Sequence, residues 1–332
     1  MTPVTSKHRP GAWSSSPVRI PGLGRSRNLV IVRAGTSSLH RQWLHDDHDE
    51  HGPRAFDLLV AAYDTRVERL GLDGTGHLFL PGSKIAGLAE LFRCYPELLE
   101  CYDYIALFDD DLLTSRAAIE RLFDIGRVYG LDLFQPALSW DSYFSYAATL
   151  QMRSYRLRFT NTVEMMCPVF SSTHLKRALP LFALGYETGI DLVWTRLTNE
   201  PWLRYAIVDE VVIIHTRPVG ATKTAQGFGA NEPYDAKAKE LLDRLGASFR
   251  GFVCYAAVGR DGYTLHGRTA IALRSVWTWA AIRFTPIGSG LFARLATDFT
   301  RHCLYRQLNM GRVDLLVIGA AQPAADFDCA MV

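Results

Sequence analysis

The sequence predicts an α/β fold in which a mixed, mostly parallel β-sheet is flanked by helices. Apolar runs alternate with helical patterns from Asn28 onward, which is the mark of βα units. One of these runs leads directly into carboxylates, and in open α/β sheets ligands bind beyond the carboxyl ends of the strands. With 332 residues, of which 48% are hydrophobic, the chain can bury a sizeable core. We therefore expect one large folded domain with a ligand site at a strand end.

The predicted strands are short runs rich in apolar and β-branched residues, bounded by Gly, Pro, Ser or charged residues. In chain order they are residues 28–32, 57–63, 77–80, 102–108, 132–138, 162–170 and 205–216. The first is followed by a turn of small residues that includes Gly35. Such a turn is typical of a strand that hands over to a ligand-facing loop.

The predicted helices follow breaks or capping residues. The run Pro81-Gly82-Ser83 interrupts the chain before a helix at residues 84–94. Ser115 is a plausible N-cap for the next helix, because apolar residues recur after it at i, i+3 and i+4 spacing. Further helices are predicted after Ser172 or Thr173, at residues 188–197 and at residues 235–245.

Three regions of the chain differ in composition. Residues 1–27 combine Pro, Gly and Ser with five basic residues, and we expect a disordered basic tail. Residues 28–248 form the predicted catalytic domain. Residues 249–332 are predicted to be a C-terminal helical appendage that is basic and aromatic, because residues 250–312 hold nine arginines, no lysine and two acids. This appendage either packs on the main domain or makes a peripheral contact with an anionic membrane.

Charge and cysteine usage limit the class of protein. The formal net charge of +2 and the absence of a nucleic-acid-binding motif argue against a nucleic-acid partner. Six scattered cysteines without a CxxC pair favour reduced thiols over a disulfide framework. No apolar segment is long enough to span a bilayer. We expect a cytoplasmic protein, either free or peripheral at the inner face of the membrane.

The run Asp109-Asp110-Asp111 follows the apolar strand 102–108. Three adjacent carboxylates repel one another unless a cation or hydrogen bonds compensate. Oxygen ligands with no cysteine nearby suit Mg²⁺ or Mn²⁺, which can neutralise a leaving diphosphate. Alternation in an extended loop places Asp109 and Asp111 on one side and Asp110 on another. The alternative is a solvated acidic turn that caps the following helix.

Four other residues are candidates for the site, each with a structural alternative. His215 becomes a third metal ligand if its strand ends near the acidic loop, and is otherwise a strand-end histidine. Lys84 adds positive charge to a helix N-terminus that favours phosphate, or is a surface lysine. Glu164 and Asp191 lie among apolar residues, either as buried, partnered acids or as general bases whose pKa is raised by desolvation.

Several stretches in order resemble the domain of unknown function 707 family, which is grouped with GT-A glycosyltransferase-like folds. They are VRAGTSSLHRQWL at 32–44, PGSKIAGL at 81–88, YDYIALFDDDLL at 102–113, DLFQPALS at 132–139, FTNTVEMMCPVFS at 159–171, TGIDLVW at 188–194 and VDEVVIIHTRPVG at 208–220. The resemblance covers roughly residues 28–220. The sequence departs from the family pattern at Ile85 and Thr188, where we expect larger aromatic residues.

The resemblance implies a GT-A-like fold that binds a nucleotide sugar and assigns residues to the site. Asp109 and Asp111 would be the metal and diphosphate pair of an Asp-x-Asp motif, with His215 as a further ligand or phosphate contact. Asp110 belongs to the same nucleotide-sugar motif. The residues that would surround the nucleotide are Arg33, Gly35 and Lys84, and those nearer the acceptor are Glu164 and Asp191.

The resulting functional prediction is a metal-dependent glycosyltransferase that uses Mn²⁺ or Mg²⁺. The donor is a nucleoside-diphosphate sugar, with a UDP-sugar favoured, and the acceptor is a hydroxyl of a glycan or a lipid-linked glycan. Two alternatives remain open. One is a non-catalytic nucleotide- or carbohydrate-binding protein of the same fold, and the other is a metal-dependent nucleotidyltransferase.

Overall fold

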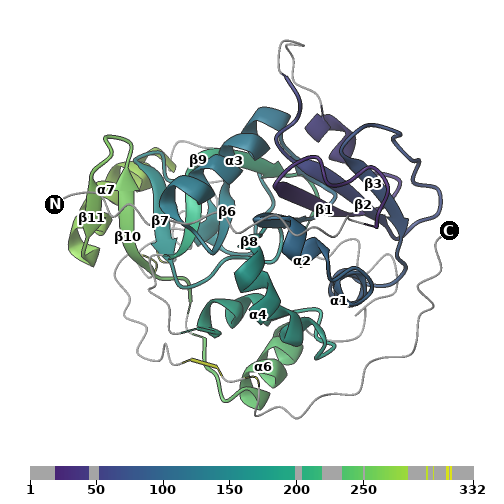
Figure 1. The fold of residues 1–332 in the computed structure, drawn as a ribbon. Coiled ribbons are helices and arrows are strands. Elements are labelled where there is room, and N and C mark those ends of the chain that lie inside the picture. The colour runs from purple at the N-terminus through teal and green to yellow at the C-terminus, as the bar shows by residue number, and fades with distance from the viewer. Residues whose placement is uncertain are drawn as a thin grey trace.

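The computed structural model describes residues 19–44, 52–198, 204–218, 234–249 and 251–282, together with residues 297, 302, 312, 313 and 315. Its strands and helices alternate along most of this chain (Figure 1). The strands are β1 Asn28–Ala34, β2 Asp57–Ala62, β3 Thr75–Phe79, β4 Tyr104–Phe108, β5 Leu112–Leu113, β6 Leu133–Leu138, β7 Tyr155–Thr160, β8 Val169–Ser171, β9 Tyr205–His215, β10 Cys254–Gly259 and β11 Thr264–His266. The α-helices are α1 Lys84–Cys94, α2 Leu98–Cys101, α3 Arg116–Tyr129, α4 Ser172–Phe182, α6 Tyr234–Arg244 and α7 Arg268–Ile282. Short 3₁₀ turns lie at His40–Leu44 (η1), Ala147–Thr149 (η2), Ile190–Leu192 (η3) and Trp194–Arg196 (η4).

Among the described residues the strands form one mixed sheet in the order β11-β10-β7-β9-β6-β8-β4-β1-β2-β3. Strands β3, β2, β1 and β4 pair in parallel, as do β6 and β9. Strand β8 runs antiparallel between β4 and β6, so these two strands point the same way. The predicted mixed, mostly parallel sheet flanked by helices is confirmed, and the carboxyl ends of β1, β2, β4, β6 and β9 share one edge.

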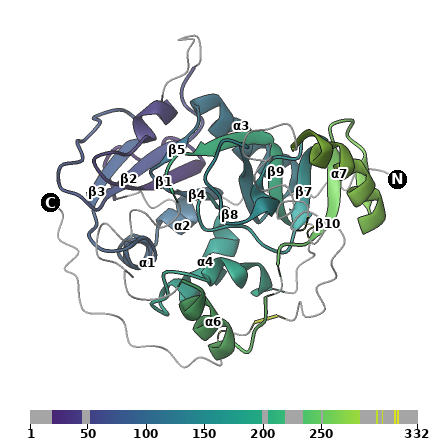
Figure 2. The same cartoon turned by 180° about the vertical axis from the view of Figure 1, so that it is seen from behind.

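Each face of the sheet is covered by its own hydrophobic cluster. In β1, Val30 and Val32 face the cluster that contains α3, whereas Leu29 and Ile31 face the cluster that contains α1, α2, α4 and α6. Because the side chains of a strand alternate, a strand buried on both faces appears in the sequence as a continuous apolar run. Helix α3 accordingly lies on one side of the sheet, and α1, α4 and α6 lie on the other (Figures 1 and 2).

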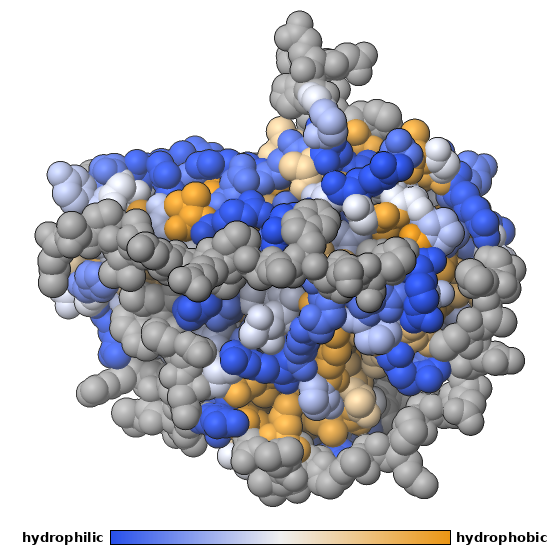
Figure 3. Space-filling model, in the orientation of Figure 1, coloured by the Kyte–Doolittle hydropathy of each residue, from blue (hydrophilic) through white to orange (hydrophobic). Residues whose placement is uncertain are grey.

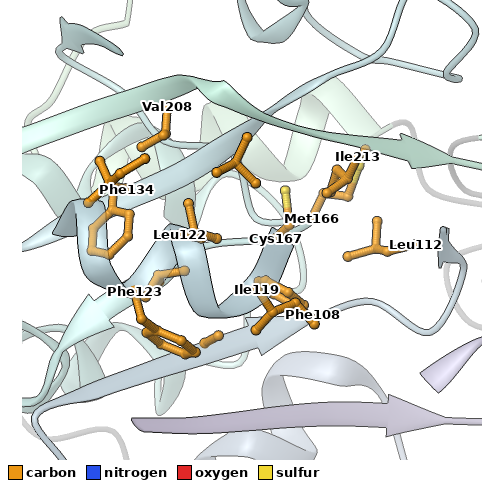
Figure 4. Packing of buried hydrophobic residues seen from close by; sticks show 14 of the residues in the cluster. Phe108, Leu112, Ile119, Leu122, Phe123, Phe134, Met166, Cys167, Val208 and Ile213 are labelled. Atoms are coloured by element: carbon orange, nitrogen blue, oxygen red, sulfur yellow. The ribbon is translucent and has the colours of Figure 1, made fainter. Parts of the chain in front are cut away.

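The α3 side of the core shows how the acidic loop is held on its apolar side. Phe108 at the end of β4 and Leu112 after the loop both point into the cluster formed with Ile119 and Leu122 of α3 (Figure 4). The side chain of Ser115 accepts a hydrogen bond from the amide of Ala118, which confirms the predicted N-cap of α3. The loop between Phe108 and Leu112 is therefore fixed at both ends by buried side chains.

Two segments differ from the predicted secondary structure. Most of the predicted strand at residues 162–170 is a turn, and only Val169–Ser171 pairs as β8. Strand β7 (Tyr155–Thr160) was not predicted, because its alternation is masked by Arg158, which is fully buried against Asp209. The predicted helix at residues 188–197 consists of the two 3₁₀ turns η3 and η4.

The chain after residue 249 begins with strands rather than helices. Strand β10 pairs antiparallel with β7, and β11 pairs with β10, so both extend the main sheet. Helix α7 follows, as expected of a helical segment, and packs against β10 and β11. The boundary at 248/249 and the membrane contact through residues 250–312 stay predictions, and most of the segment beyond Ile282 lies outside the described residues.

Two other expectations concern the N-terminal segment and the cysteines. Residues 1–18 lie outside the described residues, whereas Ile20 is buried and the amide of Gly24 donates to the Asp57 carboxylate at 2.7 Å. The end of the predicted tail therefore packs on the domain. Cys101, Cys167 and Cys254 are free thiols, but Cys94 is disulfide-bonded, so the expectation of reduced thiols is wrong for Cys94.

The surface in the view of Figure 3 is largely hydrophilic, with hydrophobic residues gathered over the region of α4 and α6. Within the part of the chain that the structure describes, no helix combines the length and apolar character needed to cross a membrane.

Candidate active site at the acidic strand end

The run Asp109–Asp111 forms the loop between β4 and β5, at the carboxyl edge of the sheet. Strand β5 pairs with the end of β9, where Leu112 lies opposite His215. This pairing brings two segments that are 103 residues apart in the chain to the same place. The condition set for His215, that its strand must end near the acidic loop, is therefore met.

Asp111 contacts His215 directly. The His215 Nε2 atom lies 3.2 Å from Asp111 Oδ2, and both side chains are largely buried. The other ring nitrogen, Nδ1, lies 3.0 Å from the carbonyl oxygen of Tyr143, which fixes the orientation of the ring. Asp111 Oδ1 is buried and has no hydrogen-bond partner.

The charges of this pair affect each other's pKa. Burial raises the pKa of Asp111, but the hydrogen bond and charge of His215 and the charge of Arg217 outweigh burial and lower it overall. Burial lowers the pKa of His215, and the hydrogen bond and charge of Asp111 raise it overall. The carboxylate is thus held ionised beside a histidine that can donate to it.

Asp110 points away from this pair and ties the acidic loop to β1 and β2. Its Oδ2 atom accepts hydrogen bonds from the amide of Gly35 at 2.8 Å and from the hydroxyl of Tyr63 at 3.1 Å. A side chain at position 35 would collide with the Tyr63 hydroxyl, since an added Cβ would lie 2.4 Å from it. Burial raises the pKa of Asp110, partly offset by the Gly35 hydrogen bond and the charge of Arg217. Asp110 and Gly35 act together as a brace, and their predicted contacts with a nucleotide sugar stay predictions.

Asp109 is paired with Lys84. The Lys84 Nζ atom lies 2.6 Å from Asp109 Oδ1 and donates to the carbonyl of Met165, also at 2.6 Å. The Asp109 side chain is 34% exposed, in contrast to those of Asp110 and Asp111 at 8% and 10%. Lys84 therefore joins the acidic loop to the chain that precedes β8 and is more than a surface lysine.

The N-terminus of α1 is occupied by Glu187, a residue the sequence did not single out. The amides of Ile85 and Ala86 donate to its carboxylate at 3.1 and 3.0 Å, and the Ser83 hydroxyl also donates to it. Such amides are the groups that favour phosphate at a helix N-terminus. In this structure both amides donate to the Glu187 carboxylate. This differs from the expectation that the helix N-terminus is available to a phosphate.

Arg33 lies at the end of β1 and faces α1. Its guanidinium donates to the carbonyl of Gly82 at 2.8 Å and packs against Gly87, where an added Cβ would lie 2.6 Å from the guanidinium carbon. Burial lowers the pKa of Arg33 to about 10. In this structure Arg33 supports the loop before α1, and its predicted contact with a nucleotide stays a prediction.

Glu164 lies in the turn next to the acidic loop, and Asp191 is near enough to Glu164 for its charge to act on that carboxyl group. The amide of Asp109 donates to the carbonyl of Met166 at 3.0 Å, which places the 162–168 turn against the loop. Glu164 is 5% exposed, its Oε2 atom has no hydrogen-bond partner, and its amide donates to Gln135 Oε1 at 2.5 Å. Burial, and then the charge of Asp191, raise the pKa of Glu164 to about 7. Glu164 is thus a carboxyl group that gains and loses its proton near neutral pH.

Arg217 also belongs to this site and was missed by the sequence reasoning. Its Nη2 atom lies 3.1 Å from Asp110 Oδ1, and its Nε atom lies 3.7 Å from Asp111 Oδ2. Its position depends on the pairing of β5 with β9, which the sequence does not reveal. The local sequence offers one signal, its distance of two residues from His215.

The predicted metal ligands are only partly brought together. Within the described ranges, no group of three His, Cys, Asp or Glu side chains is arranged to hold a metal ion. Asp111 and His215 would supply two ligands of the kinds that divalent ions bind, since Asp111 Oδ2 lies beside His215 Nε2 and the other oxygen, Oδ1, is buried without a hydrogen-bond partner. Asp109 is engaged by Lys84, so its role as a third ligand stays a prediction.

The fold and site define an α/β protein with a carboxylate-rich site at the carboxyl edge of a mixed sheet. S. aureus TarS (residues 1–349) is structurally similar, with 11% identity and a TM-score of 0.40 over 84% of this chain and 81% of that one. The mannosyltransferase PcManGT from Pyrobaculum calidifontis, solved in complex with GDP-Man and Mn²⁺, has 12% identity and a TM-score of 0.37 over 88% of this chain and 92% of that one. Both similarities lie below 25% identity and below a TM-score of 0.5, so nothing that these two proteins bind is carried over to this chain.

No protein-family model and no curated protein matches the sequence. The resemblance to the domain of unknown function 707 family therefore stays a prediction.

Proposed function

We propose that this chain is a divalent-metal-dependent glycosyltransferase that uses a nucleoside-diphosphate sugar, with a UDP-sugar as the favoured donor. The acceptor is a hydroxyl of a glycan or a lipid-linked glycan. The observation that carries the proposal is the Asp111–His215 pair at the carboxyl edge of the sheet, with an unpartnered carboxylate oxygen and a lysine and an arginine within the same cluster.

Asp111 Oδ1 and His215 Nε2 are the atoms that would hold Mn²⁺ or Mg²⁺. When bound, such an ion supplies positive charge to the leaving diphosphate. Lys84 adds a second positive charge at the same edge, and Asp110 keeps the loop rigid through Gly35 and Tyr63. The protein's own groups therefore orient the donor and stabilise the charge that develops on it.

Glu164 is the proposed general base, and Asp191 raises its pKa. The acceptor oxygen attacks the anomeric carbon, and the bond from that carbon to the diphosphate oxygen breaks with its electron pair remaining on the diphosphate. The acceptor proton passes to the Glu164 carboxylate, or to that of Asp191 if the latter is nearer to the bound acceptor. This assignment applies to inversion at the anomeric carbon.

The first test is thermal unfolding of the purified chain with UDP, GDP, CMP and their sugars, each with and without Mn²⁺. We expect stabilisation by one nucleotide family that depends on Mn²⁺. Asp111→Ala should abolish it, whereas Asp73→Ala should not, because the Asp73 side chain is 96% exposed and precedes β3, at the edge of the sheet opposite the acidic loop. If nucleotides stabilise Asp111→Ala and the parent chain equally, the proposed role of Asp111 in binding the metal and the donor is refuted.

Product analysis separates the proposal from its two alternatives. Sugar transfer releases a nucleoside diphosphate, whereas nucleotidyl transfer releases pyrophosphate. Donor binding with neither transfer nor donor hydrolysis would indicate a binding protein.

A further inference from the structure

Arg217 lies next to the place proposed for the metal and the donor. It lies two residues beyond His215, and its backbone is held near the acidic loop because the amide and the hydroxyl of Thr216 donate to the carbonyl of Asp111 at 3.0 and 2.8 Å. Its guanidinium also donates to the carbonyl of Ser37 at 3.3 Å. Arg217 thus lies between the acidic loop and the loop that follows β1.

The guanidinium covers the two buried carboxylates from the outside. The Arg217 side chain is 26% exposed, whereas those of Asp110 and Asp111 are nearly buried. The Arg217 side chain is therefore partly open to solvent while its guanidinium neutralises the carboxylates. A guanidinium fork matches the oxygens of a phosphate group better than an ammonium does.

Only one oxygen of Asp110 depends on Arg217. If the arginine moves away, Oδ2 keeps its hydrogen bonds from Gly35 and Tyr63, and Oδ1 exchanges the guanidinium for water or for the ligand that enters. The contact with Asp111 is longer, at 3.7 Å, and Asp111 keeps His215. A divalent cation on Asp111 would repel the guanidinium, since both positive charges would face the same carboxylate.

We propose that Arg217 is a diphosphate-binding residue that exchanges partners: it neutralises Asp110 and Asp111 in the free protein and moves to the donor diphosphate when a divalent metal is bound. This inference rests on the proposed function and adds which positive charge neutralises which group at each stage. The metal displaces the Arg217 guanidinium from the carboxylates, and the diphosphate then binds that guanidinium. Metal and nucleoside diphosphate should therefore bind cooperatively, each increasing the affinity for the other by the same factor.

The test measures two affinities in Arg217→Ala, Arg217→Lys and the parent chain. Free Mn²⁺ is followed by electron paramagnetic resonance during titration of the protein without nucleotide. The binding of the nucleoside diphosphate selected by the stabilisation panel is then measured by calorimetry at saturating Mn²⁺. Arg121→Ala is the matched control, because Arg121 pairs with Glu210 on β9, away from the acidic loop. Thermal unfolding without ligand shows whether each variant is folded.

In Arg217→Ala we expect Mn²⁺ alone to bind about threefold more tightly, because a solvent-screened positive charge beside Asp111 no longer repels it. We expect the diphosphate to bind about tenfold more weakly at saturating Mn²⁺, because a charge-assisted contact of this kind is typically worth that factor or more. Arg217→Lys should lie between Arg217→Ala and the parent chain in diphosphate affinity, and Arg121→Ala should match the parent chain.

The opposite signs of the two effects distinguish partner exchange from a purely structural role, which would weaken both kinds of binding. Weakening of both in a folded Arg217→Ala, or no change in either, overturns the inference while leaving the proposed function in place. Absence of nucleotide binding in the parent chain, with and without Mn²⁺, overturns the proposed function and this inference together.

Discussion

Replacing Glu164 by Gln should stabilise the folded protein at alkaline pH and remove its activity. Glu164 is 5% exposed, and burial together with the charge of Asp191 raises its pKa from 4.5 to about 7. The folded protein therefore binds this proton more tightly than the unfolded chain does. As a consequence, the free energy of unfolding decreases as the pH rises from about 4.5 to 7 and loses nothing further from this group above pH 7.

The magnitude follows from the difference between the two pKa values. Since one pKa unit corresponds to about 1.4 kcal/mol, the ionised Glu164 costs about 3 kcal/mol of folding free energy above pH 7. A glutamine has nearly the same shape and no charge to bury. We expect Glu164→Gln to exceed the parent chain in free energy of unfolding by up to about 3 kcal/mol at pH 8, and to differ little at pH 4.5.

Urea unfolding at several pH values between 4.5 and 8 measures this difference directly. Glu68→Gln is the control, because the Glu68 side chain is 77% exposed. A difference between Glu164→Gln and the parent chain that stays constant across this pH range would refute the reasoning. In assays of sugar transfer, loss of activity at all pH values would agree with Glu164 as the general base.

Three further perturbations test the acidic edge and the fold that supports it. Lys84→Ala removes the ion pair with Asp109 and should weaken nucleoside diphosphate binding about tenfold at saturating Mn²⁺ by calorimetry, with Lys84→Arg losing less. Arg158→Met leaves the fully buried Asp209 unpaired and should lower the free energy of unfolding at pH 7 by about 3–5 kcal/mol in urea titrations, whereas an unchanged unfolding midpoint would contradict the ion pair. Gly126→Ala places a Cβ 2.1 Å from the buried ring of Phe134 and should destabilise the protein by about 1–3 kcal/mol. Its nucleotide affinity should not change. Thermal unfolding of the free and nucleotide-bound forms measures both effects.

Strands with a continuous apolar run were predictable from the sequence because both of their faces are buried. The prediction at residues 28–32 corresponds to β1, and that at 102–108 corresponds to β4. Strand β7 was not predictable, because Arg158 interrupts its apolar residues with a charge. Only the structure shows that this arginine is buried in an ion pair with Asp209. The predicted strand at 162–170 is apolar because the turn packs under the acidic loop, and an apolar composition alone does not separate a buried turn from a strand.

The acidic run could be placed at a strand end from the sequence, since it directly follows an apolar strand. Its partners could not be assigned in the same way. The contact between Asp111 and His215 depends on the register of β5 against β9, and Arg217 joins the site through the same register. Glu187 binds the N-terminus of α1 at Ile85, 102 residues earlier in the chain. No local sequence pattern predicts such a contact.

The pairing of β10 with β7 has a practical consequence for dividing this chain. A fragment that ends at residue 248 keeps the acidic loop, Glu164 and Arg217, yet it exposes the backbone of β7 along the edge where β10 now pairs. An open strand edge with unpaired amides and carbonyls invites other chains to pair with it. Strand β10 covers that edge, and the sheet then ends in β11, an edge strand of only three residues, so a fragment meant to retain the site should extend at least through His266.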